Sequence, residues 1–202
     1  MAIAVILDQR RSRHSTDLVA STADQLNGSL GAALTLPFVR TAGDEMQAVL
    51  ATGGALATVA SRCLESAHWW IGVGLGPIDP SLAPTAREAR GPAFWNARTA
   101  LARAHQRKGG STGPIAVVAD ADDAPLAEEL ETALSAIAFI VSRRTGRQRE
   151  AIAVSRETVG VRRVAERLSI SPSAASQLLR AGGLEEQRRL ETLVARRAAE
   201  VS

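Results

Sequence analysis

The sequence has almost no cysteine or lysine, and it lacks any apolar run long enough to cross a membrane. Cys63 is the single cysteine, so an intramolecular disulfide is excluded, and we expect its side chain to be a small buried hydrophobe. One lysine accompanies 23 arginines, which we interpret as a coding bias and not as a functional feature. No basic leader precedes the first apolar segment, so the sequence predicts a cytoplasmic protein with no membrane partner.

Several common site motifs are also missing. The three histidines have neither ligand spacing nor cysteine partners, which argues against zinc. There is no serine elbow and no convincing pairing of cysteine with histidine. Gly72, Gly74 and Gly76 do not form a dinucleotide fingerprint, because Pro77 follows where a helix should begin. These alternating glycines instead predict a strand with one bare face, on which a helix, a ligand or a second subunit could pack closely.

Length and charge indicate two parts. With 202 residues the chain suits one domain and a smaller appended one. Residues 143–202 contain thirteen arginines and seven acidic residues, a net charge of +6, so the preceding 142 residues carry −3. A basic C-terminal part suits a polyanionic partner, although a solvated helical surface would give the same split.

The pattern of apolar segments predicts an α/β fold. A short run at 3–8 reads as a central strand buried on both faces. The order that follows is βαββαβ, a ferredoxin-like arrangement, with one further strand. Pro37 indicates that the first arm of the predicted hairpin lies at an edge or is bulged. The predicted segments are a helix over 15–30, hairpin arms at 33–41 and 45–51, a helix over 53–66, a strand at 69–78, a helix over 91–106 and a strand at 114–120.

Two carboxylates should meet at one edge of this sheet. A right-handed crossover makes the first two strands parallel, and the hairpin places the third between them. Asp8 ends the first strand and Asp44 lies in the hairpin RTAGDEMQAVL, so both should face one crevice. Such a pair suits Mg²⁺ or Mn²⁺ holding a nucleotide phosphate. The alternative is that Asp8 only ends a strand and Asp44 only makes a turn.

Four separated blocks carry a family resemblance over nearly the whole chain: AVILDQRRSR, RTAGDEMQAVL, WWIGVGLGPI and GPAFWNARTAL. Together they resemble the SatD family of bacterial proteins. The Asp-containing strand and the Gly-Asp hairpin are also similar to the palm of class III nucleotidyl cyclases. That resemblance implies that Asp8 and Asp44 are metal ligands and that Arg40 and Glu88 contact a nucleotide base.

The chain departs from the cyclase pattern at two positions. Where cyclases have an Asn and an Arg that stabilise the reacting phosphates, this sequence has Trp95 and Thr99. Asn96 and Arg98 are one residue away, and since one residue rotates a helical position by about 100°, we expect them to face elsewhere. An active cyclase is therefore not expected, because phosphoryl transfer needs that charge stabilisation. A nucleotide-binding palm and a purely structural one both stay open.

The C-terminal part predicts a helix-turn-helix. A connecting helix at 125–144 leads to a basic helix at 144–156, then to helices over Val161–Leu168 and Pro172–Ala181. Ser171 can cap the last of these, whereas Ser169 stands where glycine is usual. The predicted DNA contacts are Arg162, Arg163 and Arg167 to the backbone, and Ser171, Ser173, Ala174, Ser176, Gln177 and Arg180 on the second helix.

We therefore expect a cyclase-like α/β domain at 1–123, a connecting helix at 124–143 and a DNA-binding domain at 144–202. The leading hypothesis is a transcriptional regulator whose catalytically degenerate front domain binds a nucleotide or mediates dimerisation. The final helix, from Leu184, would pack on this module or pair two chains into a homodimer. Two alternatives stay open: an enzyme or binding protein that uses Asp8 and Asp44 on nucleotides, and a protein-interaction adaptor that uses the basic helices.

Overall fold

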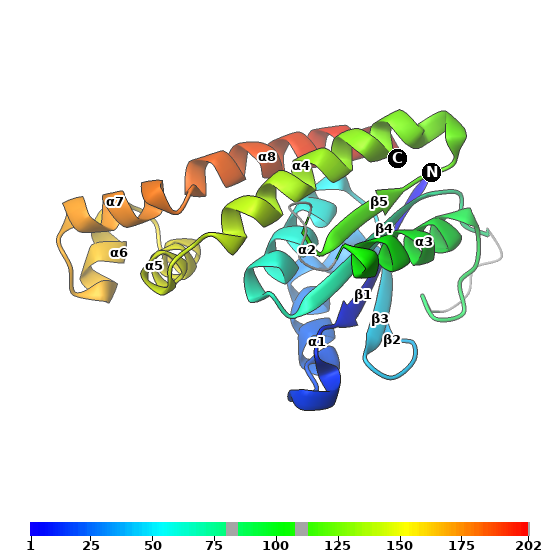
Figure 1. The fold of residues 1–202 in the computed structure, drawn as a ribbon, viewed down its shortest axis with the longest axis horizontal. Coiled ribbons are helices and arrows are strands. Elements are labelled where there is room, and N and C mark those ends of the chain that lie inside the picture. Colours follow the sequence, from blue (N-terminus) through cyan, green and yellow to red (C-terminus); the bar gives the residue numbers. More distant parts are fainter. Residues whose placement is uncertain (80–84, 108–112, 202) are drawn as a thin grey trace.

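A computed structural model describes residues 1–79, 85–107 and 113–201, and in this part of the chain five strands form one mixed sheet (Figure 1). The strand order is β2-β3-β1-β4-β5. The strands are β1 Ala2–Gln9, β2 Leu34–Arg40, β3 Glu45–Leu50, β4 Trp69–Gly76 and β5 Ile115–Val118. The expectation of an α/β fold is confirmed.

The pairing of the strands agrees with the sequence patterns. β1 is the central strand and is antiparallel to both β3 and β4, while β2 is antiparallel to β3. β1 and β2 therefore run parallel with β3 between them, as predicted, and β5 adds to β4 in parallel. β2 lies at an edge, and its register shifts between Leu36 and Val39, around Pro37. Pro37 lacks an amide hydrogen, so an interrupted edge is where it can be accommodated.

Helices cover both faces of the sheet. Ile3, Val5 and Leu7 of β1 belong to the main core with α1, α2 and α4, while Ala4 and Ile6 face α3. The helix α8 lies outside α2 and α4 (Figure 1). The helices are α1 Val19–Leu30, α2 Gly53–Ser66, α3 Pro92–Gln106, α4 Ala124–Ser142, α5 Gly146–Glu157, α6 Val161–Leu168, α7 Pro172–Ala181 and α8 Leu184–Ala198.

The bare face of β4 is filled by α3. A Cβ atom built on Gly72 would lie 2.3 Å from the carbonyl oxygen of Ala97, and one on Gly74 would lie 2.0 Å from that of Ala93. The helix backbone therefore approaches the strand more closely than any side chain would allow. Of the predicted uses of the alternating glycines, close packing of a helix is the one observed.

The C-terminal helices divide between two cores. Leu134 of α4 and Val194 of α8 belong to the main core, together with the sheet. By contrast, α5, α6 and α7 pack around a small cluster of their own, centred on Ala151, Val164 and Ala175, and project from one end of the molecule (Figure 1). We call α5–α7 the helical module. The sequence placed α8 with this module, whereas in the structure α8 returns to the sheet and packs on α2 and α4.

The single cysteine and the lack of long apolar segments are both reflected in the structure. Cys63 lies in the main core, and burial raises the pKa of its thiol to about 12, so the side chain behaves as a neutral hydrophobe as expected. Over the described residues, none of the helices combines the length and the apolar character that crossing a membrane requires.

Candidate functional sites

The first candidate site contains the two predicted carboxylates. Asp8 lies near the end of β1, on the face covered by α3, and its Oδ2 is 2.9 Å from Nε2 of His105. The two atoms are at ion-pair distance but lack the alignment of a hydrogen bond. Asp44 lies in the turn between β2 and β3, where its side chain accepts a hydrogen bond from Ser12 and its carbonyl one of 3.0 Å from the amide of Gln9.

Asp8 and Asp44 are neighbours in the fold, because Asp8 lies opposite Glu45 in the β1–β3 register and the amide of Gln9 bonds to the carbonyl of Asp44. Burial, followed by the charge of Asp44, raises the pKa of Asp8 from its usual 3.8 to about 6. Glu45, which lies opposite Asp8 in the β1–β3 register, raises it further, while His105 opposes these effects. Burial and the charges of Asp44 and Glu45 together therefore outweigh the opposing effect of His105 on the pKa of Asp8.

This shifted pKa predicts a pH-dependent effect on stability. The folded protein holds the Asp8 proton more tightly than the unfolded chain does, so ionisation of Asp8 destabilises the fold as pH rises from about 4 to 6. We expect Asp8→Asn to raise the free energy of unfolding at pH 8 by about 1–2 kcal/mol, with the gain vanishing near pH 4. Urea unfolding at a series of pH values measures it.

The matched control is Asp24→Asn on α1, which removes the same charge from an exposed position. This variant should change stability by less than about 0.5 kcal/mol at every pH. A gain for Asp8→Asn that is the same at pH 4 and pH 8 would contradict the electrostatic explanation.

Among the described residues, the structure offers only two of the side-chain ligands that the predicted metal site would need. Within the described ranges, no group of three or more His, Cys, Asp or Glu side chains is arranged to hold a metal ion. Asp8 and Asp44 could supply two oxygen ligands to a divalent cation, and Mg²⁺ commonly takes its others from phosphate and water. A metal here would therefore depend on the nucleotide that accompanies it.

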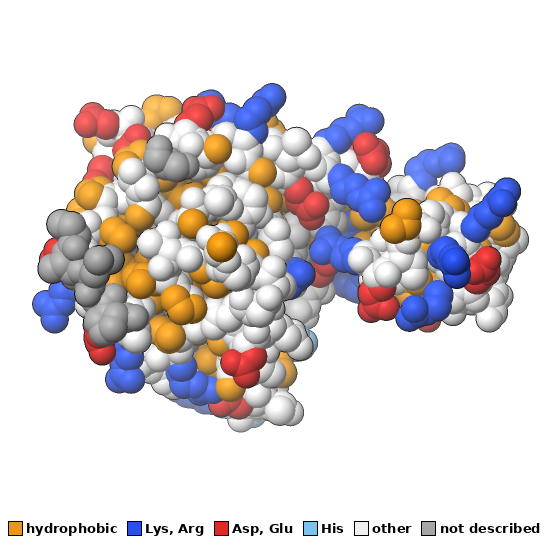
Figure 2. All heavy atoms as spheres, turned by 180° about the vertical axis from the view of Figure 1, so that it is seen from behind, with side chains coloured by type: hydrophobic (Ala, Val, Ile, Leu, Met, Phe, Trp, Pro, Cys, Tyr) orange, Lys and Arg blue, Asp and Glu red, His pale blue; other side chains and the backbone are white. Residues whose placement is uncertain are grey.

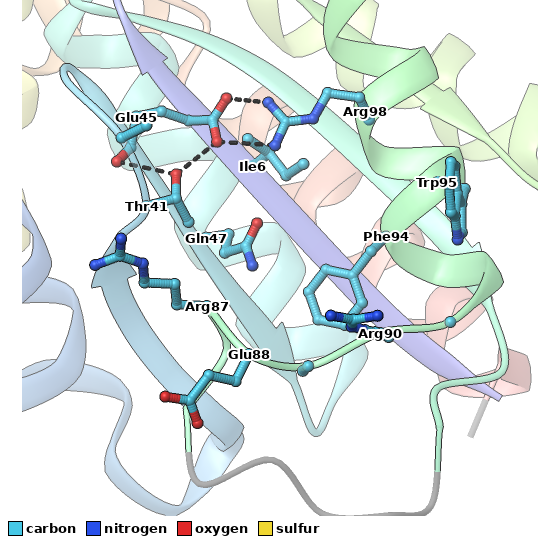
Figure 3. A pocket seen from close by; sticks show the side chains of 13 residues that line it. Ile6, Thr41, Glu45, Gln47, Arg87, Glu88, Arg90, Phe94, Trp95 and Arg98 are labelled. Carbon is cyan, nitrogen blue, oxygen red and sulfur yellow. Dashed lines mark hydrogen bonds and ion pairs between the residues drawn. The ribbon is translucent and has the colours of Figure 1, made fainter.

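The two predicted base-contacting residues lie apart. Arg40 donates two hydrogen bonds to the carboxylate of Asp17, at 2.7 and 2.8 Å, and a third of 2.5 Å to the carbonyl of Gly43. Glu88 instead lines a pocket of about 880 Å³ on the α3 side of the sheet, and Arg40 is not among its lining residues (Figure 3). The structure does not bring Arg40 and Glu88 together at one site.

Arg98 corrects one expectation about α3. It was expected to face away from the site, but its guanidinium reaches back over the sheet and pairs with Glu45, with one hydrogen bond of 3.0 Å (Figure 3). The Glu45 side chain is only 13% exposed, so its carboxylate requires a nearby cation. The arginine side chain is long enough to reach Glu45 although its position on α3 is rotated by one residue. Asn96 does point elsewhere, donating hydrogen bonds to Leu75 and Asp120.

We call the cavity of about 880 Å³ that Glu88 lines the α3 pocket. Its lining residues are Ile6, Thr41, Ala42, Glu45, Gln47, Arg87, Glu88, Ala89, Arg90, Gly91, Phe94, Trp95 and Arg98. No sequence pattern predicted most of these residues. Glu45 and Gln47 could have been found, because both follow Asp44 in the hairpin motif and alternate onto the same face of β3. No motif marks Arg87 or Arg90, which lie on the connection between β4 and α3.

The helical module has the helix boundaries that its sequence predicts. α6 ends at Leu168, and Ser169 adopts a left-handed conformation with φ +52° at the position where glycine is usual. Ser171 caps α7 by accepting a hydrogen bond of 3.1 Å from the amide of Ala174, and Pro172 takes the first helical position. The small residues Ala165 and Ala175 are buried where the helices cross.

Most of the predicted DNA contacts lie on the surface of this module. The exposed ones are Arg162, Arg163, Arg167, Ser171, Ser173, Gln177 and Arg180, while Ala174 and Ser176 are half-buried. Arginines are spread over the projecting lobe in Figure 2. Arg167 lies 3.1 Å from Glu157 and Arg163 lies 4.0 Å from Glu166. Such exposed pairs contribute about 0–1 kcal/mol, so a phosphate could displace them.

Comparisons with known proteins give one result. The family model described as SatD family matches residues 5–195. This range includes nearly all of the sheet, the α3 pocket and the helical module. No curated protein and no solved structure matches the chain.

Proposed function

We propose that this chain, which belongs to the SatD family, is a DNA-binding transcriptional regulator in which α6 and α7 form a helix-turn-helix. The observation that carries the proposal is the exposed polar surface of α7 next to the exposed arginines of α6. The cap at Ser171 and the left-handed Ser169 separate these two helices over a three-residue break, which is the geometry that such a motif requires.

In this proposal α7 enters the major groove. Gln177 pairs with an adenine edge, and Arg180 contacts guanine or phosphate. Ser173 and Ala174, near the start of α7, have side chains short enough for the helix to come close to the bases. Arg162 and Arg163 of α6 bind the backbone phosphates and carry no sequence information themselves.

The α/β part would then serve as the sensing or dimerising domain. The order β2-β3-β1-β4, with α1 and α2 on one face, supports a ferredoxin-like, cyclase-like palm to which β5 is added. Trp95 and Thr99 stand where cyclases hold phosphate-stabilising residues, which supports a degenerate palm. The proposal includes a homodimer, because DNA-binding proteins with two-fold symmetry bind two half-sites about 34 Å apart. Sedimentation as a monomer at micromolar concentration would remove the dimer.

The DNA proposal makes separate predictions for two kinds of residue. Arg180→Ala and Gln177→Ala should change which sequences bind, with a loss of about 1–3 kcal/mol at the affected base pair. Arg162→Ala should weaken binding to all sequences and lower the salt slope by roughly one. Selection of bound genomic fragments, followed by fluorescence anisotropy over a series of salt concentrations, measures both effects.

The charge-matched control is Arg62→Ala, on α2 of the sheet domain. Arg62 is exposed and hydrogen-bonded to Ser29, far along the chain from the module. This variant should leave both affinity and salt slope unchanged. Binding that does not depend on salt, or an equal loss in Arg62→Ala and Arg162→Ala, would refute α6 as the phosphate-binding helix.

A second candidate function follows from the neighbouring carboxylates. Asp8 and Asp44 lie close together, with Glu45 opposite Asp8 and the amide of Gln9 bonded to Asp44, and a divalent cation bound by both carboxylates would offset their mutual repulsion. This supports a nucleotide-binding or nucleotide-acting protein that uses Mg²⁺ or Mn²⁺. Its signature is binding of ATP or GTP that requires the metal and is lost in the Asp8→Ala, Asp44→Ala double variant.

A further inference from the structure

We propose that the α3 pocket binds a phosphorylated planar compound, such as a nucleoside phosphate, through arginines and without a metal ion. The pocket lies between the sheet, the first turns of α3 and the connection that precedes α3 (Figure 3). Its volume of about 880 Å³ falls within the range of about 300–1,000 Å³ that is typical of small-molecule sites.

Two arginines give the pocket its affinity for anions. Arg87 and Arg90 both line the pocket, and both side chains are exposed. Glu88 also lines the pocket, but its carboxylate points away from the Glu45–Arg98 pair (Figure 3). A guanidinium presents a planar fork of N–H groups that matches phosphate oxygens, so two exposed guanidiniums at one pocket favour this type of ligand.

The backbone that carries these arginines is held in place. Gln47 of β3, only 6% exposed, donates a hydrogen bond of 2.5 Å to the carbonyl of Ala86. At the other end of the segment, the amide of Asp79 donates one of 2.8 Å to the carbonyl of Arg90. The amide of Glu88 bonds to Thr85 at 3.2 Å and closes a turn between them. The backbone at both arginines is thus held in place before a ligand arrives, which reduces the entropy lost on binding.

The rest of the pocket suits a flat apolar group. Phe94 extends into the pocket from α3, and Ile6 forms part of its floor. Trp95 also lines it and is 75% exposed, an unusual position for the largest apolar side chain in a protein with only three tryptophans. Aromatic rings stack on planar ligands, and base–aromatic stacking contributes about 1–3 kcal/mol per base.

This site adjoins the carboxylate pair without including it, because Glu45 lines the α3 pocket and lies opposite Asp8 in the β1–β3 register. Asp8, Asp44 and Arg40 do not line the α3 pocket, and the residues proposed here include no metal ligand. The inference therefore depends neither on DNA binding by the helical module nor on the second candidate function, and one experiment can distinguish all three.

Calorimetry of the full chain in EDTA, with AMP, ATP and inorganic phosphate as probes, tests the proposal. We expect AMP and ATP to bind without metal, at least tenfold more tightly than inorganic phosphate. The Arg87→Ala, Arg90→Ala double variant should lose at least tenfold in affinity for both nucleotides. Trp95→Leu should lose affinity for AMP and leave that for phosphate unchanged.

Two controls define the outcomes. Arg62→Ala removes a surface arginine on the opposite side of the sheet, and it should bind the probes as the parent does. The Asp8→Ala, Asp44→Ala double variant should also retain binding in EDTA. The proposal is overturned by binding that appears only with Mg²⁺ and needs these aspartates, by equal affinity for AMP and phosphate, or by no binding of any probe at millimolar concentration. DNA binding measured in parallel can succeed or fail independently.

Discussion

Gly74→Ala should reduce the free energy of unfolding by about 3 kcal/mol or more, although it adds a single methyl group. The new Cβ would lie 2.0 Å from the carbonyl oxygen of Ala93 and 2.2 Å from the amide nitrogen of Ala97. Both are backbone atoms of α3, so no side-chain rotation can relieve the overlap and the helix must move away from β4. Urea or thermal unfolding followed by circular dichroism measures the loss.

The same substitution at Gly54 is the control. A Cβ there would meet only the Oγ1 of Thr52, at 3.9 Å, and alanine favours helix more than glycine by about 1 kcal/mol. Gly54→Ala should therefore be neutral or slightly stabilising. If the two variants unfold together, β4 and α3 are not packed as closely as described.

Arg144→Met should cost about 3 kcal/mol, because it removes a buried guanidinium and leaves the carbonyl of Gly182 and the side chains of Glu65 and Gln187 without the donor that they share. Arg144 is 4% exposed, and it donates hydrogen bonds to Gly182 at 2.7 Å, to Glu65 at 3.2 Å and to Gln187 at 2.5 Å. Burial lowers the pKa of this guanidinium and the charge of Glu65 opposes that shift, yet an arginine stays protonated in either case. Methionine preserves much of the side-chain length and removes all three hydrogen bonds.

Arg143→Met, one residue earlier, is the matched control. Arg143 is exposed, and its guanidinium lies 4.7 Å from the ring centre of Phe139, a contact worth about 0.5–1 kcal/mol at an exposed site. Unfolding of the two variants should differ by at least about 2 kcal/mol. Equal losses would show that Arg144 does not hold a buried network.

The elements that the sequence predicted well are those determined by local chemistry. The uninterrupted apolar run of β1 requires burial on both faces, and Pro37 can be placed only where the ladder is interrupted. The bounds of α6 and α7 follow from Ser169, Ser171 and Pro172, which act within a few residues of themselves. In each case the deciding interaction joins residues that are close together in the sequence.

The features that the sequence did not predict depend on distant partners. The position of α8 on α2 and α4 depends on Val194 and Ala198, which are buried in the main core. Gly53 of α2 lets the backbone of α8 approach closely at Ala195. Arg98 faces the α3 pocket because Glu45 lies 53 residues earlier and is buried opposite it. Arg87 and Arg90 belong to no periodic segment, so only the fold shows that they share a cavity.

The network at Glu65 also determines how the projecting helices are attached. One carboxylate oxygen of Glu65, on α2, accepts hydrogen bonds from Arg144, Arg156 and Gln187, which lie where the chain enters the helical module, within it, and where it leaves. The helical module is thus connected to the rest of the chain by α4 and α8 (Figure 1), both of which pack on α2, and the Glu65 hydrogen bonds join α2 to the base of the module. A rotation of the helical module relative to α2 would therefore have to break these hydrogen bonds to Glu65.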